Sequence, residues 1–505
     1  MVLLLKAKLL DYVDRLPTVL LNGDVASSLG VIEGSRVKCE YGGISRTFFV
    51  AISSSIPKNR VGLDRKSAKA LNVAAGRPVK VSYCPPPDSV GYIKKKIQGH
   101  ALGRDEIMAI TRDVVDGVLS DAEICGFMLS QHLRGMSMEE IEYLTNSIVE
   151  TGSKIEFDRP VYDKHSIGGV PGNKVSLVIV PIVAAAGLLI PKTSSRAITS
   201  PSGTADTMSV LANVEFTPSE FKSIASKVGG SIAWGGKLGL APADDIFIRR
   251  CEHPLGIDPI SQMIASVMAK KVAVGANYLV LDIPTGRGSK VEKTEDARAL
   301  ASSFMEIGRR VGIHVVCGIT YGSQPVGHAV GPALEAREAL QCLEGKGPIS
   351  LREKSTALAG VLLEMSGVAT SGNGQSVAKR ILDSGQALKK MKEIIEAQGG
   401  DPRIRSQDIA VGSHVVSLPS PCDGYISEVD NNAINEVAKA AGAPTDKGAG
   451  VLLHGKRGYV VKKGDPILDI YAEHASKLSD AYSIAQRSKP ITVEGMLLHL
   501  IPDTI

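Results

Sequence analysis

The pattern of hydrophobic and polar positions changes several times along the chain, and each change marks a different kind of structure. Residues 1–84 contain short runs of alternating character, which predict strands. Residues 95–152 carry helix-start signals and form an all-helical segment. Between residues 158 and 400, strand-like and helix-like runs alternate, and short strand-like runs separated by glycine return after residue 415. This order predicts a multidomain α/β protein.

The first region contains an internal repeat. Residues 29–41 and 71–83 both fit the pattern Leu-x-Val-x-x-Gly-x-x-Val-Lys-x-x-Tyr. Each copy predicts a turn followed by a strand. Two such copies predict a small pseudo-symmetric β-barrel, similar to double-psi barrels, which we interpret as an assembly or packing domain.

Proline and capping residues place the boundaries of the helical region. Three consecutive prolines at 85–87 cannot continue a strand or helix and indicate a linker. Ser120-x-x-Glu123 and Ser137-x-x-Glu140 are capping boxes, and Gly135 separates the helices that they open.

Two apolar runs in the central region predict strands of a parallel sheet. Residues 276–283 and 313–317 are nearly continuous apolar segments, as expected of strands that are buried on both faces. The sequence Gly-Gly-Asp-Pro at 399–402 ends this region.

Two glycine-rich segments, residues 163–176 and 193–206, predict an anion-binding pocket. Both are rich in hydroxyl groups and cations, and both lead into an apolar run that starts a helix. Free backbone N–H groups at helix N-termini bind phosphate, and Lys164 and Arg196 are expected to add full charge. The first segment lacks the P-loop spacing, and no Rossmann glycine pattern is present, so inorganic phosphate or a monophosphate fits better than a Mg-nucleotide.

Composition limits the class of protein. Aromatic residues make up only 4% of the chain, so stacking platforms for nucleic acid are not expected. The net charge of +5 suits small anionic substrates. Seven dispersed Cys residues predict a reducing compartment, hence the cytoplasm, and no zinc site. The apolar run at the N-terminus is too short for the hydrophobic region of a signal peptide. Residues 175–189 predict a buried helix rather than a membrane span.

Four motifs in the same order resemble the thymidine/pyrimidine-nucleoside phosphorylase family. They are Asp-Lys-His-Ser-x-Gly-Gly at 163–169, Ser-Ser-Arg-Ala-x-x-Ser-x-x-Gly-Thr-x-Asp at 194–206, Ala-Ser-Val-x-x-Lys-Lys at 265–271, and a glycine-rich turn at 281–290. Residues 420–426 and 464–468 resemble the C-terminal lipoyl-like β domain of the same family. The resemblance covers roughly residues 88–500.

The departures from the family pattern indicate a particular branch. The domain at 1–84 is absent from the ordinary nucleoside enzymes, Pro171 lengthens the glycine-rich loop, and Ser200 replaces a histidine. A neutral turn becomes Gly-Arg-Gly-Ser-Lys at 286–290. These features resemble the archaeal members that split AMP with phosphate into adenine and ribose 1,5-bisphosphate, with CMP and UMP as expected further substrates. Arg287 and Lys290 would neutralise the 5′-phosphate that a nucleoside lacks.

The resemblance also implies the roles of individual residues. It assigns the attacking phosphate to Lys164, Ser166, Ser176, Ser194 and Thr204. It assigns AMP to Gly169, Ser195, Arg196, Ala197, Ile198, Thr199, Ser200, Thr204, Ser266 and Lys290. Asp258 is the candidate general acid for the departing base, although Pro259 and the apolar helix that follows equally suit an N-cap. Phosphate is a co-substrate, and no metal or organic cofactor is implied.

The family fold implies the domain boundaries. Residues 88–152 and 250–272 would form a helical domain, and residues 153–249 and 273–410 an α/β domain, with the active site in the cleft between them. Residues 1–84 would form the barrel, and residues 415–505 the lipoyl-like α+β domain. Family members are dimers, and the barrel is expected to build larger homo-oligomers.

Three alternatives remain open at the level of sequence. One is a thymidine phosphorylase with a fused front domain. Another is a transferase that joins anthranilate to phosphoribosyl pyrophosphate, for which we place no Mg-binding acidic pair. The third is a non-catalytic binding or assembly protein. Lys447 lacks the usual setting of a carrier lysine, which favours a structural role for the C-terminal domain.

Overall fold

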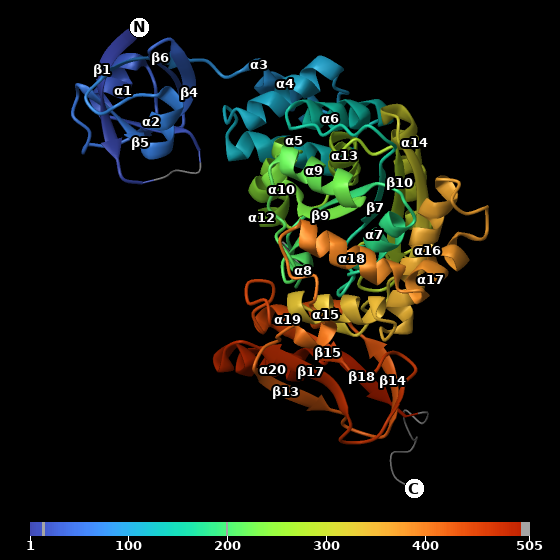
Figure 1. The fold of residues 1–505 in the computed structure, drawn as a ribbon. Coiled ribbons are helices and arrows are strands. Elements are labelled where there is room, and N and C mark those ends of the chain that lie inside the picture. The colour runs from blue at the N-terminus through green and yellow to red at the C-terminus, as the bar shows by residue number, and fades with distance from the viewer. Residues whose placement is uncertain (13–15, 198–199, 496–505) are drawn as a thin grey trace. The chain divides into compact units, whose positions relative to one another are not determined.

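The computed structural model describes residues 1–12, 16–197 and 200–495, and the chain forms two compact units (Figure 1). The first unit combines Met1–Thr151 with Pro242–Ala265, and the second combines Gly152–Ala241 with Ser266–Ile505. Within the described residues, no helix is both long and apolar enough to cross a membrane.

The first unit begins with a closed six-stranded barrel, which confirms the barrel predicted for residues 1–84. Its strands follow the order β1 (Val2–Leu10), β5 (Arg60–Asp64), β2 (Thr18–Leu21), β4 (Ile44–Ile52), β3 (Arg36–Tyr41) and β6 (Pro78–Cys84). The repeat is visible in the structure, because α1 (Gly23–Leu29) and α2 (Arg65–Leu71) both end in a left-handed residue, Gly30 and Asn72. Each of these helices leads into one of the antiparallel neighbours β3 and β6.

The rest of the first unit is helical. It contains α3 (Asp88–Ile97), α4 (Arg104–Val115), α5 (Asp121–Arg134), α6 (Met138–Glu150), α11 (Pro242–Phe247), the π-helix η1 (Ile248–Glu252), α12 (His253–Leu255) and the start of α13 (Ile260–Ala273). Both predicted capping boxes are present. Glu140 has a second role, because its carboxylate also accepts from the buried amine of Lys96 at 2.8 Å.

The later segment of this unit differs from the predicted 250–272. It runs from Pro242 to Ala265. The start moves because α11 continues directly into η1, and the end moves because α13 begins in the first unit and finishes in the second.

The second unit contains the predicted parallel strands. β10 (Tyr278–Thr285) lies between β11 (His314–Tyr321) and β7 (Tyr162–Ser166), all parallel. A bridge between Val161 and Leu189 connects β7 to the parallel pair β8 (Ile190–Ser194) and β9 (Gly230–Trp234). β10 is buried as predicted, but β11 is only partly buried because it is the outer strand of its sheet.

Helices pack around these strands. They are α7 (Ser176–Ala185), α8 (Thr204–Met208), α9 (Pro218–Val228), α10 (Gly235–Leu238), α14 (Thr294–Val311), α15 (Pro332–Leu343), α16 (Ile349–Met365), α17 (Gly374–Asp383) and α18 (Gln386–Ala397). α7 is the predicted buried helix and packs against α16 and α18 in the main core (Figure 1).

The C-terminal part of the second unit has two antiparallel sheets. One has the order β12 (Ala329–Val330), β15 (Gly450–Leu453), β17 (Pro466–Ala472) and β13 (His414–Pro419). The other has the order β16 (Val460–Val461), β14 (Gly424–Val429) and β18 (Ile491–Glu494), and η2 (Ser406–Asp408), α19 (Asn431–Ala440) and α20 (Ala475–Ser488) complete this part. β12 precedes α15 in the chain, so its pairing with β15 ties the C-terminal sheet to the α/β region.

Candidate active site

The first glycine-rich segment begins within β7 and continues past its carboxyl end, and its residues Lys164 and Ser166 join a buried polar network. Lys164 donates to the hydroxyl of Ser166, which in turn donates to Oδ2 of Asp282 on β10. Thr320 on β11 donates to Oδ1 of the same carboxylate at 2.6 Å. Ligands of parallel α/β sheets bind at this edge of the strands, so the location agrees with a substrate site.

Buried lysines outnumber the carboxylates that face them in this network. Lys271 contacts Asp163 at 2.6 Å, and Lys192 lies 3.9 Å from the other oxygen of that carboxylate. The amine of Lys354 on α16 lies 3.0 Å from Oδ2 of Asp282 but makes no hydrogen bond of good geometry within the described residues. Four lysine side chains, counting Lys164, therefore surround two carboxylates, those of Asp163 and Asp282.

This surplus of positive charge is visible in the titration of the lysines. The pKa of Lys164 is lowered to about 7, mainly by burial and also by the neighbouring ammonium groups of Lys354 and Lys271, against the opposing effect of Asp282. Burial and the Lys271 charge also hold the pKa of Lys192 well below its ordinary value. A bound anion would supply the missing negative charge and favour the ammonium forms.

The glycine-rich loop after β7 packs against the turn that carries Lys290. Gly169 has φ +105°, and a Cβ atom there would lie 2.5 Å from the backbone nitrogen of Lys290. The turn itself is held by the hydroxyl of Ser289, which donates to the carbonyls of Gly286 at 2.6 Å and Val291 at 2.7 Å. The structure thus brings together Gly169 and Lys290, two residues predicted to bind AMP.

The second glycine-rich segment begins with Thr193 and Ser194, the last two residues of β8, and Ser195 and Ala197 follow in the loop. The loop closes tightly, because a Cβ on Gly203 would lie 2.6 Å from the carbonyl oxygen of Ser195. Asp206 holds it by accepting from the backbone nitrogen of Ala197 at 2.6 Å. Thr204 opens α8, and the hydroxyl of Ser200 donates to a backbone carbonyl. Ile198 and Thr199 lie outside the described residues.

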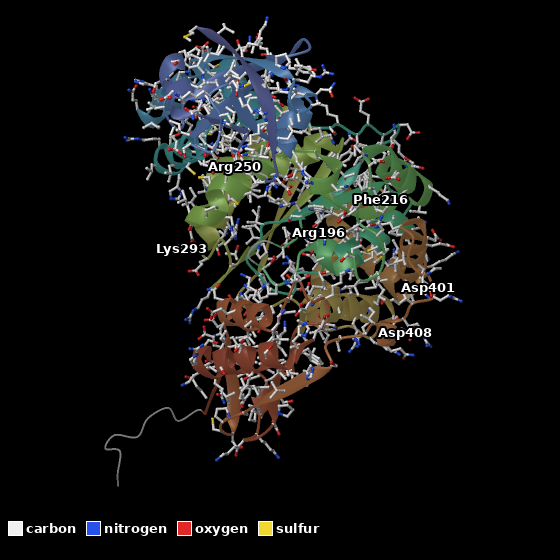
Figure 2. The ribbon with its side chains drawn as sticks, turned by 90° about the vertical axis from the view of Figure 1, so that its left-hand side faces the viewer. Arg196, Phe216, Arg250, Lys293, Asp401 and Asp408 are labelled. Carbon is white, nitrogen blue, oxygen red and sulfur yellow. The ribbon has the colours of Figure 1, made fainter. Side chains whose placement is uncertain are left out.

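Arg196 has two carboxylates and one aromatic ring as neighbours. The guanidinium of Arg196 pairs with Asp206 at 3.4 Å and with Glu215 at 2.7 Å, and it lies 5.0 Å from the ring centre of Trp234. Figure 2 labels Arg196 among the side chains of the chain. A cavity of about 250 Å³ adjoins the loop and is lined by Arg196, Ala197, Asp206, Ser209, Pro444, Thr445 and Lys447.

The remaining predicted residues lie on helices or beside them. Ser176 is buried at the first position of α7. Ser266 on α13 accepts from the amine of Lys270, one turn later, at 3.1 Å. Asp258 is exposed and belongs to the first unit, two residues before the start of α13.

Sequence reasoning assigned no role to several members of the buried network, among them Asp282, Lys192 and Lys354. Asp282 left a signal, because an isolated carboxylate within an apolar strand requires a buried partner. The sequence around Lys354 gives no such indication, since Leu-Arg-Glu-Lys-Ser at 351–355 is typical of a solvated helix face.

Comparisons with known proteins agree with this organisation. Residues 158–388 match the family described as glycosyl transferase family, a/b domain, and residues 90–152 match its helical bundle domain. Residues 425–492 match the pyrimidine nucleoside phosphorylase C-terminal domain. Anthranilate phosphoribosyltransferase (TrpD) from Thermus thermophilus shares the fold, with a TM-score of 0.52, 20% identity, and coverage of 61% of this chain and 99% of that one.

Full-length relatives define the family more closely. AMP phosphorylase 1 of Archaeoglobus fulgidus is 54% identical over 95% of this chain and 96% of its own. AMP phosphorylase of Thermococcus kodakarensis is 51% identical over 98% of this chain and 99% of its own, and that of Methanosarcina mazei is 50% identical over 96% of each. The matched domains define a glycosyltransferase of the phosphorolytic type. Within that class, the chain belongs to the AMP phosphorylase family.

Proposed function

We propose that the protein cleaves AMP with inorganic phosphate to give adenine and ribose 1,5-bisphosphate, and that it accepts CMP and UMP as well. The observation that carries this proposal is the surplus of buried lysines around Lys164 on β7, since the loop that follows β7 packs through Gly169 on the turn that bears Lys290. One anion site would take the attacking phosphate, and the turn would take the 5′-phosphate of the nucleotide.

In this reaction an oxygen of phosphate forms a bond to C1′ while the bond from C1′ to the base breaks. The bonding electrons leave with the base, whose nitrogen must then receive a proton. Lys164, Ser166, Ser176, Ser194 and Thr204 would hold and orient the phosphate, which reduces the entropic cost of joining two substrates. Asp258 would act as the general acid, and Ser266 would hold the base or sugar.

Arg287, the other cation of the turn, forms an ion pair with the C-terminal part of the chain. Its guanidinium pairs with Glu428 at 2.7 Å, so its charge is balanced by the C-terminal part of the chain. We propose that Lys290, whose backbone nitrogen packs against Gly169 of the glycine-rich loop, meets the 5′-phosphate. The reaction as proposed uses no metal or organic cofactor.

The proposal extends to the outer domains and the setting of the enzyme. The barrel would be of the double-psi type and build a homodimer into a larger assembly. The C-terminal part would be lipoyl-like but not a carrier, since the amine of Lys447 donates to the backbone of Ser209 at 3.0 Å. The seven cysteines form no disulfide, which supports a cytoplasmic enzyme.

Product analysis with labelled phosphate tests the chemistry. AMP is incubated with and without phosphate that carries oxygen-18, and the sugar product is identified by mass. The proposal predicts adenine only when phosphate is present, with label retained at the C1 phosphate of ribose 1,5-bisphosphate. Unlabelled ribose 5-phosphate would instead identify a hydrolase, and no release of base would leave a binding protein.

A further inference from the structure

Asn431, the first residue of α19, is buried against a distant part of the chain. Its side chain is 1% exposed, whereas the next residue, Asn432, is exposed. Nδ2 of Asn431 donates to the carbonyl of Gly322 at 2.8 Å and lies 3.4 Å from the carbonyl of Arg287. The C-terminal part of the chain thus reaches two loops of the α/β region through one amide group.

The carbonyl of Arg287 belongs to the turn that carries Lys290, and the carbonyl of Gly322 belongs to a loop bonded to the start of that turn. The backbone nitrogen of Gly322 donates to the carbonyl of Thr285 at 2.9 Å, at the point where β10 ends and the turn begins. On the other side, a Cβ on Gly288 would lie 3.1 Å from Cβ of Asn431. Asn431 therefore fixes the turn both by hydrogen bonding and by direct packing.

The stability of the fold alone does not explain why an asparagine occupies position 431. Oδ1 of Asn431 is buried and has no hydrogen-bond partner within the described residues. A buried polar atom without a partner costs free energy, so an asparagine here needs a compensating reason. The exposed pair of Arg287 and Glu428 joins the same two segments but, being solvated, contributes little to holding them.

We infer that Asn431 is a positioning residue for the nucleotide's 5′-phosphate. It holds the turn at 285–291, the turn packs through the backbone of Lys290 on Gly169, and Lys290 meets the 5′-phosphate. The C-terminal part of the chain thereby sets the affinity for the nucleotide but not for the attacking phosphate. The inference rests on the proposed function, from which it takes the role of Lys290.

Steady-state kinetics of the full-length protein test this assignment. Asn431→Ala should raise KM for AMP about tenfold while KM for phosphate stays within about twofold, because binding shared by ground and transition states is lost at one substrate only. Asn431→Asp should raise KM for AMP at least as much, since a carboxylate cannot donate a hydrogen bond to the carbonyl of Gly322. Asn432→Ala and Asn432→Asp are the matched controls, on an exposed neighbour, and should behave like the unaltered enzyme.

A double variant separates positioning from general damage. If Asn431 acts through Lys290, Asn431→Ala added to Lys290→Ala should cost nothing further in KM for AMP. Additive losses, equal rises in both KM values, or an effect no larger than that of Asn432→Ala would overturn the inference while leaving the proposed function intact. An unaltered enzyme that is inactive on AMP would overturn the proposed function and the inference with it.

Discussion

Gly169 and Lys290 touch through their backbones: a Cβ atom on residue 169 would lie 2.5 Å from the nitrogen of Lys290. This contact couples the loop at the phosphate site to the turn proposed for the nucleotide. It also explains why the loop needs glycine at this position, where φ is +105°.

Gly169→Ala should therefore displace the turn and reduce kcat/KM for AMP by about 100-fold or more, because small misplacements of substrate-holding groups cost rate heavily. Gly168→Ala is the matched control, since a Cβ there meets nothing within 4 Å. Steady-state kinetics of both variants provide the check. Equal activity of the two variants would refute the coupling.

Anion binding should depend on the protonation of Lys164. The pKa of this amine is lowered to about 7, mainly by burial, so in the free protein it is an ammonium below pH 7 and a neutral amine above it. An anion favours the ammonium form, and binding above pH 7 therefore carries the cost of taking up a proton. Sulfate, which remains a dianion throughout this range, should raise the melting temperature more at pH 6 than at pH 8.5.

Two variants identify the group responsible. Lys164→Met should abolish this pH dependence. Lys354→Met removes one of the charges that lower the pKa of Lys164, so the loss of sulfate stabilisation should move to higher pH. Thermal melts at several pH values measure all three proteins. If the pH dependence of sulfate stabilisation persists in Lys164→Met, a group other than Lys164 is responsible for it.

The parts of the site that sequence alone predicted are those with local chemistry. Lys164, Ser166 and Gly169 stand in one short segment, where glycine and hydroxyl residues would have no other use. The burial of Lys354 and Lys192 is created by tertiary packing, which the sequence does not display. The ion pair of Arg196 with Glu215, which comes from a later loop, is likewise not visible in the sequence. Similarly, β11 has the apolar pattern of an inner strand but lies at the edge of its sheet.

Lys174 illustrates how the first glycine-rich segment is fixed in place. Its fully buried amine pairs with Glu338 and donates to the carbonyls of Val326 at 3.0 Å and Ala329 at 2.8 Å. Lys174→Met leaves a buried carboxylate without its counter-charge and should destabilise the protein by about 3–5 kcal/mol. Urea unfolding followed by fluorescence and circular dichroism measures this. Lys58→Met breaks the exposed pair with Asp24 and should change little; equal losses in both variants would contradict this assignment.

The barrel should be dispensable for catalysis but not for assembly. It is closed, has its own core, and is followed by the proline linker at 85–87. Deletion of residues 1–84 should lower the number of chains per particle and leave phosphorolysis in place. Light scattering and an activity assay provide the two readouts. An unchanged number of chains per particle would show that the barrel is not needed for assembly.

The most direct test of AMP phosphorolysis compares AMP, adenosine and thymidine as substrates, with phosphate present, by chromatography of the released base. We expect adenine from AMP, with adenosine and thymidine left essentially intact, and a selective loss of AMP cleavage in Lys290→Ala. Thymine from thymidine, with AMP unreacted, would contradict this expectation. That result would place the enzyme among the nucleoside phosphorylases and reduce Lys290 to surface charge.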